Sequence, residues 1–266
     1  MIRLSEGEVH LWCASPGEWD DPGLAAEAHR ILDADEIARM EGIRVAEGRR
    51  LFGVSHLLVR AALSGHADRD PRQWRFVRNS HGKPRIDPAF APGAGVADLA
   101  FNLAHTRGLA VVAVTSAGEI GVDVERRDRP IRARILASRF FAPEEAAVLG
   151  KLPAARLQER FILYWTLKEA AIKALGGGLS VPLGAVGFHL AGRRPHRIAP
   201  FGAALPETEQ WRFALLALET PYIAALAVRV DPGRTLILKG HRLGPAGEVS
   251  APPLRPLGLS PGLACR

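Results

Sequence analysis

The chain has 266 residues, of which 47% are hydrophobic and 24% charged. This composition excludes a disordered protein and provides a core for one large domain or two of ordinary size. The formal net charge of +7 favours an anionic partner, such as nucleic acid, a phosphorylated small molecule or an acidic protein, without choosing among them.

The sequence also limits the compartment. The only two cysteines lie near opposite ends, which supports neither a disulfide framework nor a zinc motif. No apolar run approaches the roughly 18 residues that a membrane helix needs, and the first ten residues lack the apolar stretch of a secretory signal. We therefore expect a cytoplasmic protein without a membrane segment.

The first part of the chain mixes strand and helix patterns. Residues 8–14 read as a strand, and a helix follows with Asp33 as its N-cap. Residues 47–63 carry an apolar stripe at helical spacing. A short strand over 74–79 leads into a turn around Gly82 and Pro84.

The second part repeats this mixture. Two strands flank Ala117 and Gly118, which predicts a hairpin, and residues 154–175 form the longest helical pattern. A further strand pair surrounds Thr220 and Pro221. Residues 231–266 hold six prolines and six glycines, so we expect an irregular tail there. The predicted organisation is an N-terminal half over 1–118, a C-terminal half over 119–230 and this tail.

An acidic pair lies on the strand that follows Gly118. Asp123 and Glu125 share one face with Gly121, because side chains alternate along a strand. Two carboxylates this close repel each other unless a cation or hydrogen-bond donors lie between them. The pair is either the polar face of an edge strand or one half of a divalent-metal site.

The long helix offers a third carboxylate. Trp165, Glu169 and Lys173 follow one another at intervals of four residues and share one flank. Glu169 and Lys173 are either an ordinary surface ion pair or part of a site. With Asp123 and Glu125, Glu169 would complete an all-oxygen site that suits Mg²⁺, or alternatively Mn²⁺, and Lys173 would neutralise a phosphate oxygen.

Four motifs in order carry a family resemblance. They are "HGKP" from His81, "FNLAHT" from Phe101, "GVDVE" from Gly121 and "WTLKEAAIKALGGGLSVPL" from Trp165. In these motifs the chain resembles the 4′-phosphopantetheinyl transferases, in particular the larger, pseudo-dimeric type that activates surfactin synthetase. The resemblance implies an α+β fold of two similar halves with the site between them.

The resemblance also implies a reaction. Coenzyme A would donate its 4′-phosphopantetheine arm to a serine of an acyl or peptidyl carrier protein, and adenosine 3′,5′-bisphosphate would leave. Asp123, Glu125 and Glu169 would hold Mg²⁺, and Glu169 would help to deprotonate the serine. Lys173 would contact the phosphate and steady the leaving group.

Coenzyme contacts follow from the same resemblance, and the N-terminal half would bind much of the coenzyme. Lys83 and His105 match phosphate contacts, and Lys173 would join them. Arg39 and Arg50 lie near positions where relatives place basic residues, although Arg49 competes with Arg50 for that role. The histidine motif departs from the family, which has serines where this chain has Ala104 and Thr106.

Two other classes of protein compete with an enzyme. A non-catalytic module that binds coenzyme A or a carrier protein would have lost the metal ligands, whereas all three acids are present here. A nucleic-acid binder would explain the charge, but only 6% of the residues are aromatic and no binding motif is recognisable. We expect a monomer that binds no nucleic acid.

Overall fold

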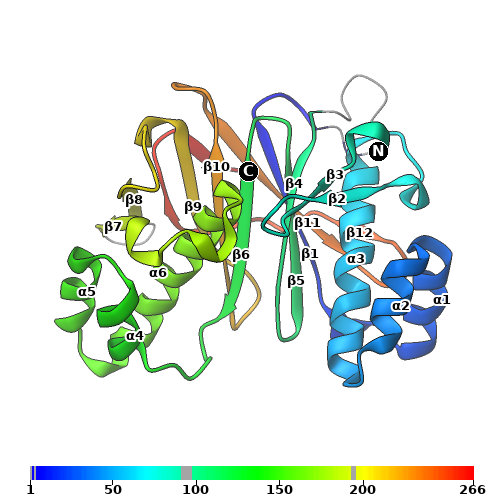
Figure 1. Ribbon diagram of the computed structural model, residues 1–266, viewed down its shortest axis with the longest axis horizontal. Helices are drawn as coiled ribbons and strands as arrows, with labels where there is room; N and C mark the ends of the chain where they lie inside the picture. Colours follow the sequence, from blue (N-terminus) through cyan, green and yellow to red (C-terminus); the bar gives the residue numbers. More distant parts are fainter. Residues whose placement is uncertain (1, 3, 91–97, 193–195) are drawn as a thin grey trace.

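The computed structural model describes residues 2, 4–90, 98–192 and 196–266, except for the side chain of residue 179. Two mixed sheets pack face to face, and helices cover the outer face of each sheet (Figure 1). The predicted α+β class and its two halves are therefore confirmed. Within the described residues, no helix combines the length and the hydropathy that crossing a membrane requires.

The sheet of the N-terminal half has the strand order β12-β11-β1-β5-β4, with β14 also paired to β11. Its strands are β1 (Glu8–Ala14), β4 (Ala100–Thr106), β5 (Leu109–Thr115), β11 (Leu236–Leu243), β12 (Val249–Ser250) and β14 (Leu263–Cys265). The helices of this half are α1 (Asp21–Ile31), α2 (Ala34–Gly42) and α3 (Ala46–His66). A separate pair, β2 (Phe76–Arg78) and β3 (Pro84–Ile86), flanks the predicted turn around Gly82.

The sheet of the C-terminal half has the order β6-β10-β9-β13-β8-β7. Its strands are β6 (Ile120–Arg126), β7 (Gly187–Ala191), β8 (His196–Phe201), β9 (Trp211–Ala217), β10 (Tyr222–Arg229) and β13 (Arg255–Leu259). The helices are α4 (Ala133–Phe140), α5 (Pro143–Gly150) and α6 (Ala154–Leu175), so the predicted helix over 154–175 is confirmed. The predicted pairing of β9 with β10 is confirmed as well.

Alternation along the strands divides the core into three layers. One face of the first sheet, with Trp12 and Val112, packs against α3, and one face of the second, with Phe213 and Ala225, packs against α6. The two remaining faces meet in a middle layer that includes Val111. Buried apolar area is the main stabilising contribution in such a core, and here the middle layer joins the two halves.

The predicted hairpin around Ala117 and Gly118 is wrong. β5 pairs with β4 and β1, whereas β6 pairs with β10 in the other sheet. Gly118 has a φ of +146°, and a Cβ there would lie 2.1 Å from the carbonyl oxygen of Arg229, so only glycine allows this crossing between the sheets. The connection that looked like a hairpin links the two halves.

The predicted irregular tail is also wrong. Within residues 231–266, β11 pairs with β1 in the first sheet, and β13 lies between β9 and β8 in the second. The prolines and glycines of this segment lie mainly in its turns and at a register shift between Pro256 and Gly258. The C-terminal segment is therefore a part of both sheets.

Three histidines lie where this segment meets β1 and the end of α3. His241 Nε2 lies 2.9 Å from His10 Nδ1, and His10 Nε2 lies 3.0 Å from Glu8 Oε2. His66 Nε2 lies 3.1 Å from Trp12 Nε1. Because an indole N–H can only donate, His66 Nε2 accepts this bond and carries no proton. The cluster is therefore built for neutral imidazoles.

Lowering the pH from 7 to 5 is expected to reduce the free energy of unfolding by about 2–4 kcal/mol. Burial, together with the neighbouring His10, lowers the pKa of His66 and of His241 from the usual 6.5 to about 4. At a pH between 6.5 and about 4, these histidines bind more protons in the unfolded chain than in the folded one. The free energy of unfolding therefore falls as the pH drops through this range. Urea unfolding at pH 7, 6 and 5 measures the slope.

The matched variant is His66→Gln, whose amide oxygen can still accept the Trp12 N–H but does not titrate. We expect a shallower dependence of stability on pH for this variant. Equal slopes for the two proteins would show that His66 does not contribute.

Candidate active site

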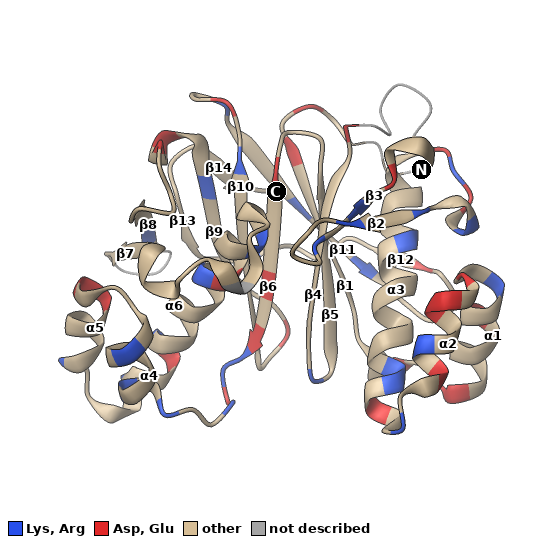
Figure 2. Ribbon diagram, in the orientation of Figure 1, with Lys and Arg blue, Asp and Glu red and all other residues tan. Residues whose placement is uncertain are grey.

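The site is built where α6 crosses β6. A Cβ on Gly121 would lie 2.0 Å from the carbonyl oxygen of Ala170 and 2.4 Å from the nitrogen of Ala174. Only glycine therefore permits this approach of the helix to the strand. It brings Glu169 and Lys173 against the strand face that carries the acidic pair, and Figure 2 shows the charged residues of both elements side by side.

The acidic pair is buried. The side chains of Asp123 and Glu125 are 11% exposed each. Lys173 Nζ donates to Asp123 Oδ1 over 2.7 Å, and Arg129 Nη1 donates to Glu125 Oε1 over 2.6 Å. Asp123 Oδ2 is buried and has no hydrogen-bond partner among the described residues. A polar edge strand in water, the simpler of the two interpretations, does not fit this burial.

The three acids influence one another electrostatically. Burial, followed by the charge of Asp123, raises the pKa of Glu125 above its usual range, although Arg129 opposes this effect. Burial and the charges of Asp123 and Glu125 likewise raise the pKa of Glu169, against the ammonium of Lys173. Three carboxyl groups therefore lie together, and two of them, Asp123 and Glu125, each have one cationic partner.

A divalent cation fits this cluster. The described part of the chain contains no group of three or more His, Cys, Asp or Glu side chains arranged to hold a metal ion. Asp123 and Glu125 are instead hydrogen-bonded to Lys173 and Arg129. The donors are nevertheless all carboxylates, which hard cations prefer. The unpartnered Asp123 Oδ2 and the mutual repulsion of the acids both call for added positive charge.

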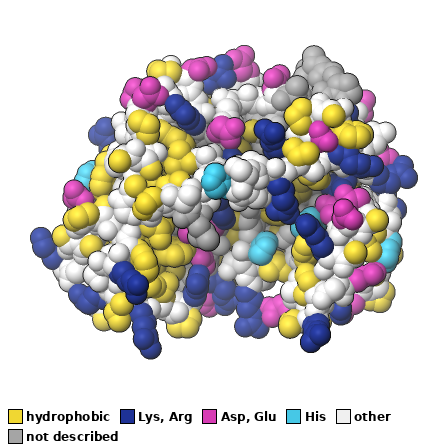
Figure 3. All heavy atoms as spheres, in the orientation of Figure 1, with side chains coloured by type: hydrophobic (Ala, Val, Ile, Leu, Met, Phe, Trp, Pro, Cys, Tyr) yellow, Lys and Arg dark blue, Asp and Glu magenta, His cyan; other side chains and the backbone are white. Residues whose placement is uncertain are grey.

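A cavity of about 670 Å³, which we call the central cavity, is lined by Glu169 but not by Asp123 or Glu125. It lies between the two halves, where the face drawn in Figure 3 is hollowed. Its charged lining residues are Lys83, Glu169 and Lys173, and its apolar ones include Phe140, Trp165, Val181, Pro182 and Leu183. Three of the predicted site residues thus meet at one opening.

A second cavity, of about 600 Å³, lies on the N-terminal half and is called the N-terminal cavity. Arg39 and His105, both predicted to contact the coenzyme, line it. The two cavities share Pro84 and Leu103 in their walls, so they are neighbours. The cavity with Arg39 and His105 therefore adjoins the one with Lys83, Glu169 and Lys173.

Sequence reasoning missed three residues of the N-terminal cavity. His56, Phe76 and Arg78 line it together with the predicted residues. Arg78 lies within the predicted strand over residues 74–79, shortly before the "HGKP" turn, and His56 lies within the predicted helix over residues 47–63. Their positions in or next to these predicted elements were the signal from which they could have been identified.

The predicted coenzyme residues have different environments. Lys83 Nζ contacts Glu119 Oε2 at 2.9 Å and the carbonyl oxygen of Ala174 at 3.1 Å, which fastens the turn to α6. His105 lies at the end of β4. Partial desolvation and, next, the charge of Lys173 lower its pKa, so the imidazole tends to be neutral.

Arg39 and Arg50 are not brought together. α2, which carries Arg39, is fixed by the buried guanidinium of Arg60, whose Nη2 lies 2.7 Å from Glu36 Oε2. Arg50 pairs with Asp21 at 2.7 Å and lines neither cavity. Its competitor Arg49 donates to a backbone carbonyl and also lies outside both linings.

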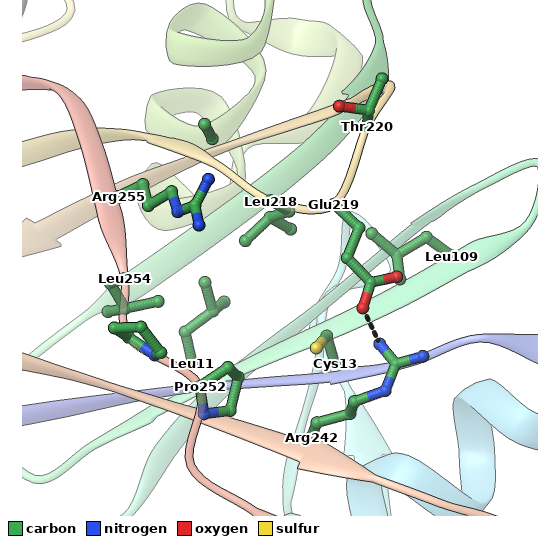
Figure 4. A pocket seen from close by; sticks show the side chains of 12 residues that line it. Leu11, Cys13, Leu109, Leu218, Glu219, Thr220, Arg242, Pro252, Leu254 and Arg255 are labelled. Atoms are coloured by element: carbon green, nitrogen blue, oxygen red, sulfur yellow. Dashed lines mark ion pairs between the residues drawn. The ribbon is translucent and has the colours of Figure 1, made fainter.

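A third cavity, of about 280 Å³, lies at another junction of the two halves (Figure 4). Leu11 and Cys13 of β1 form part of it, and Pro252 and Leu254 of the C-terminal segment form another part. At its edge, Arg242 pairs with Glu219 at 3.0 Å. None of the predicted site residues lines this cavity.

Comparisons with known proteins agree with the motifs. The family model of the 4′-phosphopantetheinyl transferase superfamily matches residues 119–227. The 4′-phosphopantetheinyl transferase HetI of a Nostoc species is 34% identical over 227 residues, which cover 85% of this chain and 90% of HetI. Sfp of Bacillus subtilis, also a 4′-phosphopantetheinyl transferase, is 33% identical over 135 residues, 51% of this chain and 55% of Sfp.

Solved structures are more distant. The holo-[acyl-carrier-protein] synthase of Thermotoga maritima is 21% identical, covers 43% of this chain and 64% of its own, and has a TM-score of 0.35. A likeness at this level does not carry the fold assignment, which rests on the two sheets described above.

Proposed function

Because the chain belongs to the 4′-phosphopantetheinyl transferase family, which transfers the phosphopantetheine group of coenzyme A to carrier proteins, we propose how its own residues divide this work. The proposal places coenzyme A across both cavities and the reacting phosphate beside Glu169 and Lys173. The observation that carries it is the meeting of Lys83, Glu169 and Lys173 at one cavity that adjoins the cavity with Arg39 and His105.

The nucleotide end of the coenzyme belongs in the N-terminal cavity. Its phosphates are multiply charged, and Arg39, Arg78 and His105 supply cations or hydrogen-bond donors there. The aromatic ring of Phe76 offers a surface on which a base can stack. The uncharged pantetheine arm then lies along the apolar wall of the central cavity.

Asp123, Glu125 and Glu169 would hold Mg²⁺ in the proposed enzyme. When bound, the ion supplies positive charge to the pyrophosphate oxygens, as in phosphoryl transfer generally. Lys173, now on Asp123, would turn one donor toward the phosphate. Mn²⁺ has similar ligand preferences and is the alternative.

The chemical step exchanges one phosphorus–oxygen bond for another. The serine oxygen of the carrier protein bonds to the β-phosphorus, while the bond from that phosphorus to the bridging oxygen breaks. Adenosine 3′,5′-bisphosphate leaves with the bond's electron pair, and Lys173 neutralises its charge. Glu169 accepts the serine proton, directly or through a water molecule.

The test is the intact mass of a purified apo acyl or peptidyl carrier protein after incubation with the enzyme, coenzyme A and Mg²⁺. A gain of one phosphopantetheine group, together with release of adenosine 3′,5′-bisphosphate, is the expected result. An unchanged mass with several carrier proteins, while coenzyme A still raises the melting temperature, would favour the non-catalytic binding module instead.

Lys83→Ala and Lys173→Ala are expected to separate binding from catalysis. Losing a charge-assisted hydrogen bond costs about 1.5–3 kcal/mol, or roughly ten- to a hundredfold. Lys83→Ala should raise the KM for coenzyme A with little change in kcat, because its contact exists before reaction. Lys173→Ala should lower kcat and kcat/KM together, because its charge meets the charge that grows on the leaving phosphate.

Steady-state kinetics at saturating carrier protein measures both variants. Glu119→Gln is the matched control for Lys83, since it removes the ion pair but keeps the lysine. If Lys173→Ala changed only KM while Lys83→Ala lowered kcat, the two roles would be reversed.

A further inference from the structure

A buried ion pair lies one residue before Glu169 on α6. The side chains of Lys168 and Glu145 are 0% and 1% exposed, and Lys168 Nζ lies 2.5 Å from Glu145 Oε2. Burial, the largest influence on each group, lowers the pKa of Lys168 and raises that of Glu145, while their mutual attraction opposes both shifts. Replacing such a pair with apolar residues is often neutral or stabilising, so stability alone does not explain it.

Both side chains of the pair make hydrogen bonds to backbone groups. Lys168 Nζ donates to the carbonyl oxygen of Leu183 over 2.9 Å and to that of Val186. Glu145 Oε1 accepts the backbone N–H of Phe188 over 2.9 Å. The two side chains therefore fasten the segment from residue 183 to residue 188 against α5 and α6.

The start of that segment is a wall of the central cavity. Val181, Pro182 and Leu183 line the cavity together with Trp165 and Glu169. Lys168 thus fixes the distance between the wall and the helix that carries Glu169. Leu183 connects the two features directly. It lines the cavity, and its carbonyl oxygen accepts the hydrogen bond from Lys168.

We propose that Lys168 and Glu145 are positioning residues that set the apolar wall for the pantetheine arm of coenzyme A. This inference rests on the proposed placement of the coenzyme. The arm is uncharged and extended, so its binding depends on a wall held at the right distance. The nucleotide end lies in the neighbouring cavity and does not depend on this wall.

The experiment uses the double variant Lys168→Met/Glu145→Leu, which removes both charges and keeps similar volume. We expect a melting temperature near that of the wild type, because both buried charges are removed together. The KM for coenzyme A should be about tenfold higher, because the hydrogen bond to Leu183 of the wall is lost together with those to Val186 and Phe188 of the same segment. The inhibition constant of adenosine 3′,5′-bisphosphate, which lacks the arm, should stay the same as in the wild type.

Two further variants keep the test decisive. Arg212→Met removes another buried cation that donates to backbone carbonyls, those of Arg234 and Glu209, but lines neither the central nor the N-terminal cavity. It should leave the KM for coenzyme A unchanged. Leu183→Ala shortens the wall itself without touching the ion pair, and should raise the same KM even if the double variant does not fold.

An unchanged KM for coenzyme A in Leu183→Ala or in a folded double variant would overturn the inference. So would equal weakening of coenzyme A and adenosine 3′,5′-bisphosphate, because that would mean a general disturbance of the site. Failure of the proposed function is distinguishable, since the wild-type enzyme itself would then leave the carrier protein unmodified.

Discussion

Asp123→Asn is expected to lower the rate of phosphopantetheine transfer by at least about a hundredfold while the protein stays folded. Removing one group that stabilises transition-state charge typically costs a factor of this size. The substitution is nearly isosteric, and the amide oxygen can still accept the hydrogen bond from Lys173. It therefore removes a charge from the proposed metal site without removing the contact that fixes the side chain.

Metal binding gives a second readout that does not depend on activity. Mg²⁺ should raise the melting temperature of the metal-free wild type, because a ligand that binds only the folded state stabilises it. The same addition should have a much smaller effect on Asp123→Asn, which has lost one carboxylate. Thermal unfolding with and without Mg²⁺ after treatment with a chelator measures both proteins.

Asp128→Asn is the control for this experiment. Asp128 follows β6, pairs with Arg126 on the surface and lines neither the central nor the N-terminal cavity. It should keep both the activity and the stabilisation by Mg²⁺. Wild-type activity of Asp123→Asn at low Mg²⁺ would contradict the metal assignment.

The acidic cluster was predictable because its information is local. Alternation on a strand puts Asp123 and Glu125 on one face, and helical spacing puts Glu169 and Lys173 on one flank. The strand pair and the helix pair come together if the helix packs on the strand face that carries the acids, and Gly121 permits this packing. The motifs therefore contain nearly everything that the cluster needs.

Strand pairing and burial of charge were not predictable in this way. β5 and β6 follow each other in sequence like the arms of a hairpin, but their partners lie elsewhere in the chain. Arg60 is fully buried between Asp33 and Glu36, although arginine is a residue that usually lies at the surface. Both features depend on contacts between distant residues, which no local pattern records.

The C-terminal segment is the clearest case, because its composition pointed away from its structure. Its six prolines and six glycines suggested an irregular chain without strands. Apart from β11, the strands between these residues are short, but all of them add to sheets that already exist. A strand needs little propensity of its own when both its neighbours and a buried face are supplied by the fold.

Truncation after Val230 is instead expected to give an insoluble or unfolded protein. The segment buries five leucine side chains, namely Leu236, Leu238, Leu243, Leu257 and Leu263. At roughly 1.5–3 kcal/mol each, their burial contributes about 8–15 kcal/mol. This is as large as the whole stability of an ordinary domain, about 5–15 kcal/mol.

The lost strands also leave gaps in both sheets. Without β11, the hydrogen-bonding edge of β1 is exposed, and without β13, β8 loses its neighbour on the β9 side. Exposed strand edges favour aggregation. The ion pairs from Arg242 to Glu18 and Glu219, which link the segment to both halves, disappear as well.

The measurement is the soluble fraction and the circular dichroism of residues 1–230, expressed alone and together with residues 231–266 as a separate chain. Co-expression should restore soluble, active protein, because the missing strands can add to their sheets without a covalent link. A chain ending after Pro261 is the matched control: it loses β14 and Leu263 but keeps β11 and β13. It should remain folded with a lower melting temperature. A soluble and fully active chain of residues 1–230 would mean that the two halves hold together without the strands of the C-terminal segment.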